Sequence, residues 1–215
     1  MQGFIKKFSE ISIQDLPLVG GKNASLGEMF SQLTSKGILA PDGFAITAEG
    51  YRLFLKENKL YERLEAILAK LDKNNFSNLD EIGGQARELI QNAPLPAPLV
   101  AQIKEAHQDL VVREGLELSL AVRSSATAED LPSASFAGQL ESFLNISGDE
   151  ELVKTVHRCF TSLFTNRAIK YREDNGLWSI VMLKTATSWS RFPATCSWPR
   201  NSLKSLTGSP LDPMT

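Results

Sequence analysis

The loop formed by residues 121–139 constrains the fold of this chain more than any other stretch, because small and hydroxyl-bearing side chains dominate it. Apolar residues alternate with small or polar ones over residues 118–122, which predicts a strand that presents Arg123 on the face opposite its apolar side. Residues 140–146 form a second strand-like run after the loop. A packed core gains little from consecutive serines and alanines, whereas backbone wrapped around an anion offers it several N–H donors. We therefore predict that a phosphate-binding loop joins two strands here.

A second candidate for anion binding is Gly20-Gly21-Lys22, which precedes apolar residues at helical spacing. The glycines let backbone N–H groups approach a ligand, and the helix N-terminus adds unpaired donors and a positive dipole end. Lys22 supplies a point charge for a phosphate. The segment is not a Walker A motif, because that motif requires a glycine where Leu16 stands. The alternative interpretations are a glycine turn with a solvated lysine and, for Arg123, an ion pair with a surface carboxylate.

Four further residues in or after the loop bear on a ligand. Gly138 allows a close backbone approach, and Ser142 offers a hydroxyl on the strand that follows. Glu129 and Asp130 form an acidic pair that would either hold a metal ion or be solvated. We assign no metal ligand in this chain.

Composition excludes several classes of function. The 215 residues are 42% apolar and 22% charged, with a net charge of -2, so no basic surface is expected for nucleic acid or anionic membrane. The first residues lack the apolar run of a signal peptide, and no stretch reaches membrane-spanning length, so we expect a cytoplasmic protein. Cys159 and Cys196 match no metal spacing or disulfide framework. His107 and His157 lie on predicted helices and are expected to be structural, which leaves no Ser/His/Asp triad.

The composition of the chain changes near Trp178. Before it, apolar spacing predicts a strand at residues 44–46 and several helices, which lie within residues 26–33, 47–55, 60–71, 79–91, 100–110 and 150–163. After it, Ser, Thr and Pro dominate, and Asp212 is the sole acidic residue. We expect residues 177–215 to be disordered or poorly packed.

The two candidate phosphate motifs resemble those of a known family. Residues 19–29 and 121–139, together with residues 41–47, are similar to the N-terminal nucleotide-binding domain of phosphoenolpyruvate synthase (pyruvate, water dikinase). The similarity covers roughly residues 4–176. It implies an α+β fold over residues 1–176, the N-terminal part of an ATP-grasp-like domain.

The resemblance also implies a role for each candidate residue. Lys22 and Arg123 match the lysine and arginine that contact the phosphates of ATP and serve catalysis in the family. The residues that would line the nucleotide site are Gly20, Gly21, Lys22, Arg123, Gly138 and Ser142.

The implied reaction of the complete enzyme converts ATP, pyruvate and water into AMP, phosphoenolpyruvate and phosphate, with magnesium and a phosphohistidine intermediate. Neither histidine here stands in the family's Gly-rich Thr-x-His context, and the adenine-binding residues and magnesium carboxylates do not follow Trp178. We therefore expect an incomplete ATP-binding portion that is inactive alone, as if the gene product were truncated or frameshifted. Its missing second lobe would expose apolar surface and favour self-association. The alternatives are a fragment of a rifampin phosphotransferase and a non-catalytic remnant that binds nucleotide or partner chains.

Overall fold

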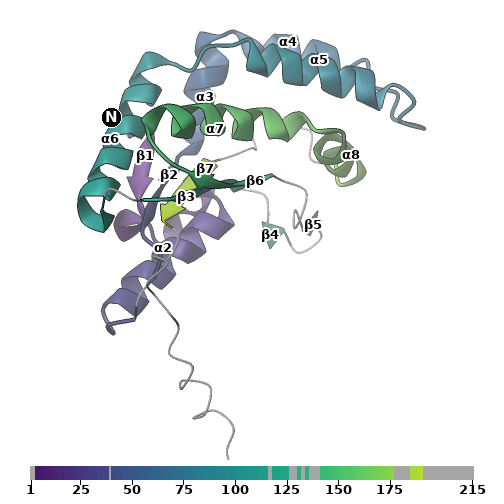
Figure 1. Cartoon of the computed structure of the whole chain (residues 1–215). Helices are drawn as coiled ribbons and strands as arrows, with labels where there is room; N and C mark the ends of the chain where they lie inside the picture. The colour runs from purple at the N-terminus through teal and green to yellow at the C-terminus, as the bar shows by residue number, and fades with distance from the viewer. Residues whose placement is uncertain are drawn as a thin grey trace, which may run out of the picture.

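A five-stranded antiparallel sheet lies at the centre of the molecule (Figure 1). The computed structural model describes residues 3–38, 40–115, 118–125, 130–131, 134–135, 141–176 and 185–190. In spatial order the strands are β1 (Ile5–Lys7), β2 (Gly43–Ile46), β7 (Thr185–Ser190), β3 (Leu120–Ser125) and β6 (Ser142–Ile146). Two short strands, β4 (Asp130–Leu131) and β5 (Ala134–Ser135), pair with each other.

Helices cover both faces of this sheet. The α-helices are α1 (Leu16–Val19), α2 (Gly21–Thr34), α3 (Ala48–Glu57), α4 (Leu60–Leu68), α5 (Leu79–Gln91), α6 (Ala97–Glu114), α7 (Asp149–Thr161) and α8 (Asn166–Asp174). The described residues also form the 3-10 helices η1 (Phe8–Glu10), η2 (Ile13–Asp15) and η3 (Ser162–Phe164). Helices α4, α5, α7 and α8 lie on one side of the sheet, and α2 lies on the other (Figure 1). Helices combined with an antiparallel sheet confirm the predicted α+β class.

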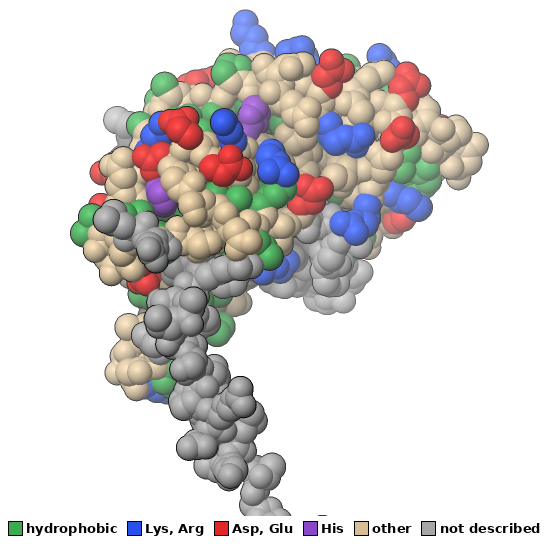
Figure 2. Space-filling model, viewed as in Figure 1, with side chains coloured by type: hydrophobic (Ala, Val, Ile, Leu, Met, Phe, Trp, Pro, Cys, Tyr) green, Lys and Arg blue, Asp and Glu red, His purple; other side chains and the backbone are tan. Residues whose placement is uncertain are grey.

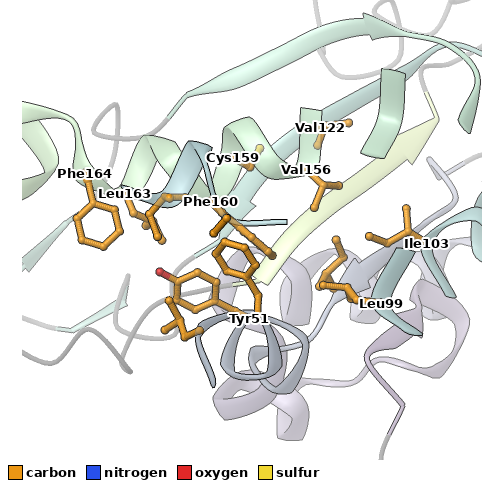
Figure 3. Packing of buried hydrophobic residues seen from close by; sticks show 14 of the residues in the cluster. Tyr51, Leu99, Ile103, Val122, Val156, Cys159, Phe160, Leu163 and Phe164 are labelled. Atoms are coloured by element: carbon orange, nitrogen blue, oxygen red, sulfur yellow. The ribbon is translucent and has the colours of Figure 1, made fainter. Parts of the chain in front are cut away.

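The larger hydrophobic core lies between the sheet and the helices of the first side. Leu120 and Val122 of β3 are fully buried in it, as their alternation in the sequence predicts. Figure 3 shows Tyr51 of α3 against Phe160 of α7, with ring centroids 4.9 Å apart and planes at 66°. Such an edge-to-face pair adds about 0.5–1.5 kcal/mol beyond the apolar area that it buries.

A smaller core lies on the opposite face, beneath α2. Its buried members are Phe8, Ile11, Val19, Ala24 and Ala45. Strand β2 therefore serves both cores, because its four residues are all buried and alternate between the two faces. The smaller core fixes α2 against the sheet, which matters for the site described below.

The prediction that residues 177–215 are disordered or poorly packed is wrong for β7. This strand fills the centre of the sheet, where Thr187 pairs with Ala45 of β2 on one side and with Arg123 of β3 on the other. The backbone N–H and C=O groups of β2 and β3 need hydrogen-bond partners, and β7 provides them whatever its side chains are. In addition, Thr and Trp, which occur in β7, are residue types that favour strands. The rest of that tail lies outside the described residues.

The surface shown in Figure 2 carries acidic and basic side chains intermingled over the helical layer. This arrangement agrees with a net charge of -2 and with the absence of a basic stripe on that face. Among the helices that the structure describes, none combines the length and the apolar character needed to cross a membrane.

Candidate functional site

A pocket of about 290 Å³ lies between the first turns of α2 and strand β3. It brings together the two motifs that the sequence singled out as phosphate-binding, although they are far apart in the chain. Its lining residues are Gly21, Lys22, Asn23, Ser25, Leu26, Met29 and Arg123. The predicted convergence of Lys22 and Arg123 on one site is therefore present in the geometry.

Helix α2 presents different side chains to the pocket and to the protein interior. Lys22, Leu26 and Met29 follow one another at helical spacing and line the pocket. The neighbouring stripe includes Ala24 and Gly27, which are buried toward the smaller core. The helix packs so closely there that a Cβ atom on Gly27 would lie 2.6 Å from the Cβ and carbonyl oxygen of Ile11.

The N-terminus of α2 is formed by the glycine pair. Gly20 is the N-cap and has φ 79° and ψ 160°, a conformation that side-chain-bearing residues rarely adopt. The helix therefore begins at Gly21. This start places Lys22 in the first turn, where the backbone N–H groups and the positive dipole end favour anions.

Arg123 contributes a buried hydrogen-bond donor for which the described residues offer no acceptor. Its side chain is half-buried, and its Nε atom is out of contact with water and has no hydrogen-bond partner among the described residues. A buried donor without an acceptor costs about 1–3 kcal/mol, and more when the group is charged. Arg123 also lines the pocket, and a guanidinium can donate a bidentate pair of hydrogen bonds to an anion.

Comparison with known families agrees with this geometry. The family model of the pyruvate phosphate dikinase AMP/ATP-binding domain matches residues 16–185, which include both pocket-forming motifs. The chain belongs to this family. The match to the AMP/ATP-binding domain runs past Gly176, where we expected the family-like part to end, and reaches the first residue of β7.

Curated relatives of this ATP-binding domain family are phosphoenolpyruvate synthases. The chain is 51% identical over 170 residues to the one from Neisseria meningitidis serogroup B and 49% identical over 174 residues to the one from Synechocystis. Each alignment covers 79% of this chain but 21% of the relative. A probable phosphoenolpyruvate synthase of Methanocaldococcus jannaschii is 47% identical over 174 residues, with 80% of this chain and 14% of the relative covered. The chain thus spans about a fifth of the length of the first two, and it is homologous to their N-terminal ATP-binding domain.

The remaining predicted residues of the ATP-binding domain are only partly placed. Ser142 pairs in register with Arg123, so the two side chains share one face of the sheet, and Ser142 is exposed. Gly138 and Glu129 lie outside the described residues, as does the side chain of Asp130. No cluster of three or more potential metal-ligating side chains occurs among the residues that the structure describes.

Asn23 was not among the site residues predicted from the sequence, but the structure places it at the pocket. The side chain is fully buried and lines the pocket, and its Nδ2 donates a hydrogen bond of 2.7 Å to the carbonyl oxygen of Val19. The sequence shows that an asparagine directly follows Lys22. It does not show that this side chain is buried, because its burial depends on the packing of α2 against the sheet.

Both histidines make contacts between helices, which agrees with the expectation that they are structural. His107 is 4% exposed, and its Nδ1 lies 2.5 Å from Oδ1 of Asp149 at the start of α7. Burial alone would raise the pKa of Asp149, but hydrogen bonds from His107 and Gln108 lower it below its usual value. The Nε2 atom of His157 lies 2.8 Å from the carbonyl oxygen of Ile90. Cys159 is buried in the larger core.

Proposed function

We propose that the pocket between α2 and β3 binds the phosphates of ATP, with Lys22 and Arg123 as the charged contacts. The observation that carries this proposal is that Lys22 and Arg123, which lie far apart in the chain, line one pocket at the N-terminus of α2. Two cations and a helix N-terminus around one pocket suit an anion with several negative oxygens.

The chemistry of phosphoryl transfer fits such a site. It requires neutralisation of charge and positioning of the phosphates more than covalent participation by the protein. Lys22 would supply a point charge, Arg123 a planar pair of donors, and Gly20 and Gly21 a close approach of the backbone. Ser142, next to Arg123 in the sheet, would add a hydroxyl, and Gly138 is proposed to line the same site.

Magnesium would have to find its protein ligands elsewhere. None of the residues lining the pocket carries a carboxylate, so these residues fit the phosphate oxygens and not the metal ion. We propose that Mg²⁺ accompanies ATP and takes its carboxylate ligands from a part of the enzyme outside this chain.

The activity of the whole enzyme is likewise a proposal. The relatives are phosphoenolpyruvate synthases of which the alignments cover only 14–21%, and their name does not favour a rifampin phosphotransferase. We propose that this chain is the first part of an enzyme that forms phosphoenolpyruvate, AMP and phosphate from ATP, pyruvate and water, and that it does not complete this reaction alone. The cytoplasmic location stays a prediction. The predicted self-association likewise stays a prediction.

Titration calorimetry with ATP, with and without magnesium, tests the phosphate site. Arg123→Ala should weaken ATP binding about 10- to 100-fold, because it removes charge-assisted hydrogen bonds that are worth about 1.5–3 kcal/mol. Arg63→Ala is the matched control, since Arg63 is an exposed arginine on α4, on the opposite side of the sheet. An Arg123→Ala protein with unchanged ATP affinity, or an equal loss in both variants, would refute the assignment.

A further inference from the structure

Asn23 closes the elbow at which α1 ends and α2 begins. The two helices are separated by one residue, Gly20, whose positive φ turns the chain away from a continuous helix. The Nδ2 group of Asn23 crosses this elbow and donates to the carbonyl oxygen of Val19, the last residue of α1, over 2.7 Å. In an uninterrupted helix the backbone N–H of the fourth residue along donates to such a carbonyl. Here a side-chain amide makes a bond between the same two residues.

Because both residues are buried, losing this hydrogen bond would be costly. Asn23 and Val19 are both 0% exposed, so a donor or acceptor left unpaired there could not turn to water. Val19 is anchored in the smaller core together with Ala45 of β2. The bond therefore ties the first turn of α2 to the sheet that also carries Arg123.

We propose that Asn23 is a positioning residue of the candidate phosphate site. Its amide holds the first turn of α2 against Val19, so that Lys22 and the N-terminal N–H groups face the same pocket as Arg123. The functional half of this inference rests on the phosphate-binding function proposed above, whereas the structural half can be measured without any nucleotide.

Three variants separate the hydrogen bond from general packing. Asn23→Ala removes the donor, and Asn23→Asp keeps the shape but faces the Val19 carbonyl with a carboxylate. Asn58→Ala is the control, because Nδ2 of Asn58 also donates to the carbonyl four residues earlier, that of Phe54, over 2.9 Å, and in addition to the carbonyl of Pro94 over 3.0 Å. Asn58 lies at the end of α3, away from the residues that line the pocket.

Amide hydrogen exchange on the ligand-free chain is the first measurement. The amide of Ala24, which donates to the carbonyl oxygen of Gly20, and the amides of the next turn of α2 should exchange about five- to tenfold faster in Asn23→Ala and in Asn23→Asp, and at the wild-type rate in Asn58→Ala. Lowering the pH from about 7.5 to about 5 should bring Asn23→Asp back toward the wild type when the two are compared at each pH, since a protonated carboxyl regains a donor. Asn23→Ala should show no such recovery. Unchanged exchange in both variants, or equal recovery of both, would overturn the proposal.

Titration with ATP and, separately, with adenosine is the second measurement. The affinity for ATP should fall about fivefold or more in Asn23→Ala, whereas Asn58→Ala should bind ATP as tightly as the wild type. The affinity for adenosine, which has no phosphate, should be the same in all variants. Faster exchange with undiminished ATP affinity would show that the bond does not position the phosphate contacts, and the proposal would fail. If the wild type binds no ATP, the function proposed above fails, and the exchange and pH results alone then decide whether Asn23 holds the elbow.

Discussion

Gly27→Ala tests whether the close packing of α2 against Ile11 fixes the candidate site. Gly27 is buried in the middle of α2, and an added Cβ would lie 2.6 Å from the Cβ, Cγ2 and carbonyl oxygen of Ile11. None of these atoms can rotate away, because two belong to a β-branched side chain beside the backbone and the third is the backbone itself. The helix must therefore move outward by a fraction of an ångström or more.

The expected magnitude is the difference between two opposing effects. Overpacking of this kind costs typically about 1–3 kcal/mol, and contact with a backbone atom places Gly27→Ala at the upper end. Alanine regains about 1 kcal/mol because glycine is the poorer helix former. The net loss of unfolding free energy should be about 2 kcal/mol, which lowers Tm by about 4–8 °C in a chain of this size.

Urea unfolding followed by circular dichroism measures this loss, and Gly84→Ala provides the matched control. A Cβ on Gly84 in α5 would have its nearest contact at 3.9 Å, with the mobile end of Arg87, so the same substitution should stabilise the chain by about 0.5–1 kcal/mol. ATP affinity should fall in Gly27→Ala, because Lys22 moves with α2, and stay unchanged in Gly84→Ala. A Gly27→Ala protein as stable as Gly84→Ala would refute the packing argument.

Two other substitutions test the sheet and the link between α6 and α7. Thr187→Pro should lower the unfolding free energy by about 2–3 kcal/mol in a urea titration, because proline removes a backbone N–H from the central strand. The control Thr187→Val keeps this N–H and should change the unfolding free energy little. Equal stability of the two variants would contradict the strand order. Asp149→Asn should be less stable than the wild type near pH 7. Since the folded-state pKa of Asp149 is lowered, its contribution is present above the unfolded value of 3.8 and is lost as the pH falls through the folded value. The difference between the two proteins should therefore shrink below about pH 4 in thermal melts, and a difference independent of pH would show that this carboxylate is not the cause.

The residues that the sequence marked out as special are those whose chemistry does not depend on distant packing. Gly20 and Lys22 stand together in the chain, and a glycine pair before a helix predicts an anion-binding N-terminus from local rules alone. That Arg123 faces the same pocket was expected only through resemblance to a family, because no local rule brings β3 beside α2. The pairing of His107 with Asp149 was not predicted for the same reason, since it joins residues 42 positions apart.

The composition of residues 177–215 predicts disorder, and this prediction failed for β7 because strands pair through backbone groups. A segment rich in Ser and Thr has too few apolar side chains to fold by itself, so disorder was the expectation. In the folded chain, β2 and β3 present two rows of backbone donors and acceptors, and β7 pairs with both. Tertiary context therefore overrode the local preference, as it commonly does for strands.

The strand order makes the geometry of the candidate site depend on β7. Ala45, Thr187, Arg123 and Ser142 stand in one register row across β2, β7, β3 and β6. Ala45 packs in the smaller core that holds α2, while Arg123 supplies the other wall of the pocket. Since neighbouring strands lie about 4.8 Å apart, the single strand β7 sets a separation of roughly 10 Å between these two anchor points. A nucleotide site whose width depends on β7 should lose phosphate affinity when β7 is disrupted, even though none of the residues known to line the pocket comes from that strand.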